Sequence, residues 1–166
     1  MQQNQTDHKE VFIKMVLSNW ELQLSRANDL FGRLSDEELS ARTAPGRNTG
    51  VYLLGHLAAV NDGMFTFLGL GDRVDSKMDE AFVANPENSG IEKLSVAQIK
   101  VYWNKVNALL TEKMGVMNAD DWFTRHTAIS EENFAKEPHR NKLNIVINRT
   151  NHLSYHLGQL VYLAKK

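Results

Sequence analysis

The chain has 166 residues, of which 42% are hydrophobic and 23% are charged, and its formal net charge is −1. These values are typical of a soluble globular protein, so we predict one domain over residues 1–166, and the balanced, interspersed charges argue against nucleic-acid binding. The sequence contains no cysteine, which excludes disulfides, cysteine-ligated zinc and a cysteine nucleophile.

The first half of the chain predicts two long helices and a short one between them. Apolar residues recur at three- and four-residue steps over Thr6–Leu34, with Thr6 as the predicted N-cap. The predicted apolar face of this helix comprises Phe12, Met15, Val16, Leu22, Leu30, Phe31 and Leu34. A short helix is predicted within Leu34–Arg42. The second long helix is predicted over Thr49–Leu68, between the breaker APGRN and the stop signal GLGDR.

The second half predicts two more long helices, over Ser95–Met117 and Asn141–Leu163. Two long connections, Gly69–Leu94 and Asn118–Arg140, precede them, and the first is predicted to hold one helical turn near Lys77–Val83. Connections of this length often carry function, and we expect both to cover a site. No stretch alternates as a strand does. We therefore predict an all-α fold, an up-and-down four-helix bundle.

Membrane insertion and export are not expected. The longest nearly apolar stretch, Val51–Val60, is far shorter than the roughly 20 residues that cross a bilayer. The N-terminal residues lack the charged-then-apolar order of a signal peptide. The absence of cysteine agrees with a reducing compartment, and we expect a cytoplasmic protein.

Three of the six histidines have the spacing of metal ligands. His152 and His156 are four residues apart, so both rings leave the same face of the fourth long helix. His56 lies in the second long helix, within VYLLGHLAAV. Each of the three immediately precedes a residue of its helix's apolar stripe, which places it at the flank of the core. Two such imidazoles can hold one ion, and a third from another helix can complete a three-nitrogen site.

The spacing alone leaves a structural interpretation open. A random chain of this composition has roughly 0.2 histidine pairs at this spacing, and a lone histidine at a core edge is more often a hydrogen-bonded structural residue. His8, His126 and His139 lie in polar surroundings, and we predict surface positions for them by default. His126 is a partial exception, because WFTRH (Trp122–His126) lies in a long loop that is a candidate to cover the site. Gly55 and Gly158 each adjoin a candidate ligand or follow it, and a mid-helix glycine there indicates close approach or an open cavity.

Two motifs resemble the DinB-like superfamily of four-helix-bundle metalloproteins, the DinB/YfiT group. One is PGRNTGVYLLGHL (Pro45–Leu57), and the other is RTNHLSYHLGQLVYL (Arg149–Leu163), with its HxxxHxGQ run. The order of helices fits over nearly the whole chain. The resemblance implies a bundle with a crossover connection. It also implies a divalent ion, zinc or nickel most often, bound by His56, His152 and His156.

The resemblance also implies a chemistry, since characterised relatives include transferases and isomerases that use low-molecular-weight thiols. Such a site activates a thiol or water for transfer to, or hydrolysis of, a small electrophile, as in a metal-dependent thiol S-transferase or a hydrolase. Gln159 is a candidate to orient a ligand imidazole or a substrate carbonyl, with a bundle-interior hydrogen bond as the alternative. Tyr155 is a candidate donor to a substrate oxyanion, with simple packing as the alternative. The alternative function is a non-catalytic, stress-related binding bundle with a structural or vestigial metal site.

A homodimer is also expected. Relatives often form two-fold dimers, and the first and third long helices offer apolar residues for an interface. The residues predicted to be exposed for this purpose are Trp20, Leu24, Val101 and Trp103.

Overall fold

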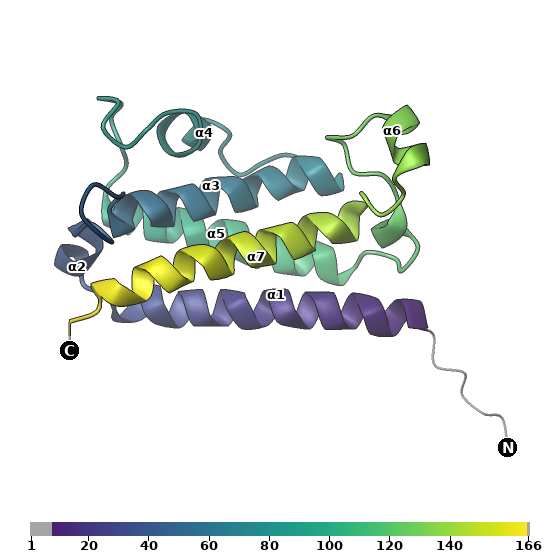
Figure 1. Ribbon diagram of the computed structural model, residues 1–166, viewed down its shortest axis with the longest axis horizontal. Coiled ribbons are helices and arrows are strands. Elements are labelled where there is room, and N and C mark those ends of the chain that lie inside the picture. The colour runs from purple at the N-terminus through teal and green to yellow at the C-terminus, as the bar shows by residue number, and fades with distance from the viewer. Residues whose placement is uncertain (1–7, 166) are drawn as a thin grey trace, which may run out of the picture.

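The structure, a computed structural model, describes residues 8–165, and over this range the predicted all-α fold is confirmed. Four long helices pack side by side (Figure 1): α1 (His8–Arg33), α3 (Gly50–Leu68), α5 (Val96–Gly115) and α7 (Lys142–Leu160). The connections hold the short helices α2 (Asp36–Ser40), α4 (Met78–Phe82) and α6 (Glu131–Lys136), and the 3₁₀ turns η1 (Asp121–Phe123) and η2 (Val161–Leu163). In the described part of the chain, extended pairing is limited to two isolated bridges, Arg42 with Thr49 and Arg125 with Asn141.

Polar side chains cap the long helices at their predicted starts. Thr49 accepts a hydrogen bond from a first-turn backbone N–H of α3, and Asn141 does the same for α7. Ser95 forms a full capping box at the start of α5. At the other end of α3, Gly69 adopts a left-handed φ of 71°, which favours glycine. The predicted N-cap Thr6 lies outside the described residues.

The two helices that carry the candidate ligands, α3 and α7, are antiparallel neighbours. Lys100 Nζ lies 3.5 Å from the carbonyl oxygen of Leu34, so α5 begins beside the end of α1. The backbone N–H of Thr127, beyond the end of α5, donates to the carbonyl of Phe67 near the end of α3 at 3.2 Å. Helices α3 and α5 therefore run in the same direction, whereas in the predicted up-and-down order consecutive long helices alternate. Residues 69–95, which connect the two helices, return along the length of the bundle (Figure 1). Helix α7 runs antiparallel to α3 and packs against both α3 and α1.

The face that α1 buries differs in part from the predicted one. The C-terminal residues of the predicted face are buried as expected: Leu30, Phe31 and Leu34. Phe12, Met15 and Leu22, however, are 47%, 64% and 49% exposed, whereas Trp20 and Leu24 are buried. The prediction failed because α1 carries apolar residues around more than one side, and the positions of α5 and α7 decide which side is covered. The apolar periodicity of a single helix does not reveal which of its apolar sides other helices will cover.

The same packing overturns most of the surface expected for a dimer. Trp20 is 1% exposed and Trp103 is 2% exposed, so both belong to the core. The indole N–H of Trp103 donates to Asn28 Oδ1 at 2.8 Å, and its ring lies edge-on to Phe31. Of the four residues predicted for that surface, only Val101 is exposed, at 67%.

A buried carboxylate holds the connection after α3 against the bundle. Asp62, which is fully buried, accepts hydrogen bonds from the backbone N–H groups of Val74 and Asp75 at 2.7 and 3.1 Å. It also accepts a hydrogen bond from the Tyr102 hydroxyl at 2.9 Å and forms an ion pair with Arg73 at 3.3 Å. Four donors on one carboxylate fix the path of the segment that leads into α4.

Among the described helices, α3 alone is long and apolar enough to cross a membrane by length and composition, and 67% of its apolar window is buried in the bundle. That degree of burial is expected for the core helix of a soluble domain.

Candidate metal centre

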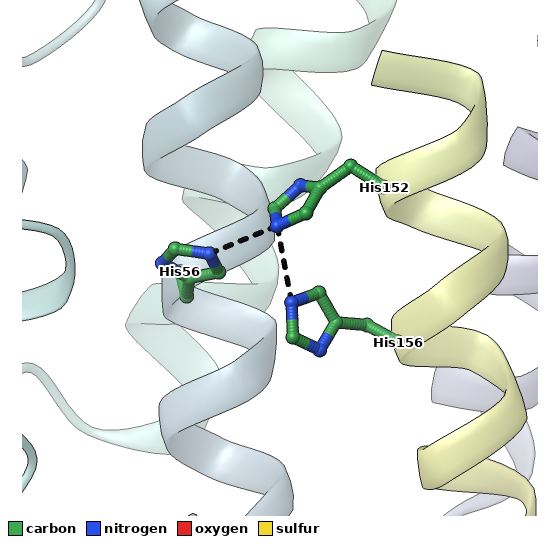
Figure 2. Close-up of side chains that lie close together, drawn as sticks. All are labelled: His56, His152 and His156. Atoms are coloured by element: carbon green, nitrogen blue, oxygen red, sulfur yellow. Dashed lines mark hydrogen bonds between the residues drawn. The ribbon is translucent and has the colours of Figure 1, made fainter. Parts of the chain in front are cut away.

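The three predicted ligands meet between α3 and α7. His152 Nε2 lies 3.2 Å from His56 Nε2 and 3.1 Å from His156 Nε2 (Figure 2). The ring planes are nearly perpendicular to one another, with centroids 4.6–5.4 Å apart, and all three side chains are half-buried. The i,i+4 spacing and the antiparallel partner helix thus produce the predicted convergence.

Two of the three rings have their tautomer fixed by an acceptor behind them. His56 Nδ1 lies 2.8 Å from the carbonyl oxygen of Phe82, and His156 Nδ1 lies 2.7 Å from Gln159 Oε1. Because both partner oxygens can only accept, each Nδ1 must carry the proton. The Nε2 atoms of His56 and His156 therefore carry lone pairs, and both face His152 Nε2. Metal-binding histidines are commonly oriented in this way, by a hydrogen bond from the other ring nitrogen.

The neutral triad has fewer protons than its contacts need. His152 Nε2 faces two acceptor nitrogens and can donate at most one proton, while its own Nδ1 is buried without a hydrogen-bond partner. At least one of the two Nε2···Nε2 contacts then has no proton of its own and is not a hydrogen bond. A cation at the centre removes this conflict, because all three lone pairs become ligands.

The nitrogen separations also suit an ion. Nitrogen ligands 2.0–2.1 Å from a tetrahedral cation lie about 3.3 Å apart, and in an octahedral arrangement about 2.9 Å apart. The two separations that involve His152 Nε2, 3.1 and 3.2 Å, fall between these values, and the ligand atoms of all three histidines lie within 4.8 Å of one another. His56, His152 and His156 therefore form a group that can hold a metal ion.

Burial keeps the triad in its metal-binding protonation state. Desolvation lowers the pKa of all three histidines, since an imidazolium loses hydration among packed helices. Desolvation, and after it the charges of the other two histidines and Arg149, lowers the pKa of His152 to about 4. The rings are therefore neutral near pH 7, as ligation requires.

The packing of α4 on α3 supplies the support for His56. A Cβ on Gly55 would overlap the ring of Phe82, which is fully buried, so the glycine allows the close approach that the sequence indicated. The ring of Tyr52 stacks on His56 with an interplanar angle of 7°. Gly158 has the other predicted property, since a Cβ there would enter open space.

A cavity of about 260 Å³ opens beside His156. Its lining includes Arg47, Asn48, Leu53, Tyr155, His156 and Gln159. Tyr155 is 65% exposed, so it is not packed in the interior, and its ring lies edge-on to His156. The side-chain oxygen of Gln159 already binds His156, which makes it the partner that orients this imidazole.

The remaining histidines do not join the triad. His8 and His139 are exposed, as predicted. His126 is only 6% exposed, and its Nδ1 accepts the backbone N–H of Ala128 at 3.2 Å, so its predicted surface position is wrong. Thr127, the next residue, donates hydrogen bonds to the carbonyl oxygens of Thr66 and Phe67 at the end of α3, about three helical turns from His56. The residues around His126 are polar, so nothing in the sequence indicated this contact.

Sequence reasoning missed two groups beside the triad. The Phe82 carbonyl carries no sequence signal, because any residue supplies a backbone oxygen. Arg149 had a signal that was not used: it precedes His152 by three residues and so shares its helical face.

Comparison with known proteins agrees with this geometry. The family model of the DinB superfamily matches residues 19–160, a range that includes all three histidines. A search of curated proteins finds no match. The resemblance seen in the two histidine motifs is confirmed by the family match. The chain belongs to the DinB superfamily.

Proposed function

We propose that this protein is a divalent-metal-dependent enzyme that activates a thiol or water for transfer to, or hydrolysis of, a small electrophile. The observation that carries the proposal is the convergence of three Nε2 atoms from two helices, with too few protons to satisfy their contacts. Zinc and nickel are the ions we propose, since imidazole suits both. Three protein ligands leave coordination positions for a reactant, as in catalytic sites.

The proposed chemistry depends on the full positive charge of the metal ion, which neutral imidazole ligands do not reduce. A divalent ion held by three neutral imidazoles lowers the pKa of a bound water toward 7 and deprotonates a bound thiol. The protein contributes orientation: the Phe82 carbonyl and Gln159 hold two of the rings from behind. Such partners keep the ligand nitrogens aimed at one point while reactants exchange.

The cavity beside His156 supports a small substrate. Its volume of about 260 Å³ is slightly below the usual range for drug-sized ligands. In this proposal the exposed hydroxyl of Tyr155 donates to a substrate oxygen at the cavity mouth. The thiol, of low molecular weight, comes from outside because the chain has no cysteine, and such a thiol stays reduced in the cytoplasm, where we place the protein.

Metal analysis and activity together test this function. Protein purified without an affinity tag is expected to hold about one equivalent of metal, and His152→Ala to hold almost none. The control His139→Ala removes an exposed histidine outside the triad. Thiol transfer and hydrolysis are then measured over a panel of small electrophiles. A wild-type content below roughly 0.2 equivalents, with no uptake on titration, would refute the metal centre.

The same experiment separates the alternative, a bundle with a structural or vestigial metal site. The ligands come from both α3 and α7, so an ion ties two helices together whether or not it reacts. In that case His152→Ala lowers the melting temperature, and wild-type protein with full metal shows no turnover on the panel.

The homodimer also stays a proposal. Its support lies in exposed apolar residues of α1, such as Phe12 and Met15, because the tryptophans first assigned to the interface are buried. Light scattering of the purified protein measures the mass directly.

A further inference from the structure

Arg149 is a half-buried arginine that lacks an acidic partner. It lies one turn before His152 on the face of α7 that carries the ligands. Its guanidinium carbon lies 5.9 Å from the ring centroid of Phe67, so the side chain reaches toward α3. Within residues 8–165, no hydrogen bond or ion pair to its guanidinium is found. A half-buried arginine without a carboxylate partner keeps its N–H donors available to bind an anion.

The surroundings of the triad share this deficit of negative charge. Within residues 8–165, no aspartate or glutamate forms a hydrogen bond or ion pair with any of the three histidines. The cavity beside His156 is lined by Arg47 and by no acidic side chain. With a divalent ion in place, the ion and the guanidinium of Arg149 would share one face of α7 with neutral ligands only. An anion from outside the protein would be favoured there.

The form of Arg149 narrows the choice of anion. Its planar donors match the two oxygens of a carboxylate, whereas a thiolate or hydroxide offers a single atom. The guanidinium carbon lies over the ring of Phe67, and no hydrogen bond within residues 8–165 occupies its N–H donors, so these donors can bind a ligand. Arg149 and Gln159 lie at opposite ends of the row that contains His152 and His156, so a ligand at Arg149 leaves the cavity at Gln159 free.

We propose that Arg149, together with the metal centre, binds the carboxylate of a small molecule, so that the substrate or cosubstrate of this enzyme is a carboxylic acid. This inference rests on the proposed function, because the ion supplies the second positive charge.

Calorimetric titration of zinc-loaded protein tests the inference. Succinate is the probe, and succinamide, of similar size but neutral, is its control. Wild type is expected to bind succinate more tightly than succinamide. Arg149→Gln is expected to weaken succinate binding about ten- to a hundredfold, as for loss of charge-assisted hydrogen bonds, while its zinc content stays at the wild-type level. Arg26→Gln, which removes an exposed arginine of α1, is the matched control and should bind succinate as wild type does.

Each outcome bears on a different claim. Equal succinate affinity in wild type and Arg149→Gln, with zinc bound in both, overturns the role of Arg149 and leaves the metal centre intact. Equal binding of succinate and succinamide to wild type also overturns it. A wild type that binds no zinc removes the proposed function, and the inference with it. If Arg149→Gln does not fold, Arg149→Met keeps an apolar stem against Phe67 and decides in the same way.

Discussion

Two glycines beside the metal centre allow a matched test of how the site is supported. Gly55 and Gly158 both lie inside long helices, in α3 and α7. A Cβ at Gly55 would overlap three atoms of the Phe82 ring, whereas a Cβ at Gly158 would meet nothing within 4 Å. Replacing each by alanine therefore makes the same chemical change with and without a packing conflict.

The expected magnitudes follow from this difference. Glycine to alanine inside a helix stabilises by about 0.5–1 kcal/mol, and Gly158→Ala should show this gain in the free energy of unfolding. Gly55→Ala has the same gain but must displace a fully buried phenylalanine, and overpacking costs about 1–3 kcal/mol. The Gly55 variant should therefore be less stable than the Gly158 variant by about 1–3 kcal/mol, because the backbone contribution is common to both.

Urea denaturation of the metal-free variants measures this difference, and metal titration measures its effect on the site. Displacing Phe82 moves the carbonyl that orients His56, so metal affinity should fall about 10–100-fold in Gly55→Ala and stay unchanged in Gly158→Ala. Stabilities that agree within about 0.5 kcal/mol would refute the close packing of α4 on α3. Unchanged metal affinity in a destabilised Gly55→Ala would refute the role of the carbonyl.

Three further predictions concern the network, the protonation and the candidate site residues. Asp62→Ala should lower the free energy of unfolding by about 3–5 kcal/mol, because it leaves the Tyr102 hydroxyl and two backbone N–H groups short of an acceptor and removes one of the two carboxylates that pair with Arg73. Asp72→Ala, on the exposed loop, should change it by less than about 0.5 kcal/mol, and similar values for the two variants in urea denaturation would contradict the network. Metal-free protein should lose stability as the pH falls from 6.5 toward 4, since the unfolded chain protonates His152 near 6.5 and the folded chain resists until about 4. His152→Gln should flatten that pH profile, and a wild-type profile that is already flat would count against the lowered pKa. Gln159→Leu should weaken metal binding about 10–100-fold and Tyr155→Phe should not, as metal titration can establish; equal affinities would show that Gln159 does not orient its histidine.

The helices could be predicted because their signals are local. Caps such as Thr49, Ser95 and Asn141 act within one turn, and the structure places them at the predicted starts. The histidine pair is local in the same sense, since two residues four apart must share a helical face. The convergence of His56 with that pair needed more than spacing, and the family resemblance supplied it.

What the sequence did not reveal depends on contacts between distant segments. The buried side of α1 was misassigned, because the choice between Phe12 and Trp20 depends on helices far along the chain. His126 looked like a surface residue until the fold brought its segment against α3. The unpartnered state of Arg149 is a property of its neighbours in space, and no pattern in its own segment reports it.

The Phe82 carbonyl has a consequence for how this site can change over time. Its oxygen belongs to the main chain, so no exchange of side chain at that position deletes the hydrogen bond to His56 directly. Evolution can preserve the bond only by preserving the backbone path of residues 69–82, which depends on Gly55 and Asp62. Neither residue is a candidate metal ligand. A search for conserved ligand residues would therefore overlook these positions, although mutations there would still impair the site.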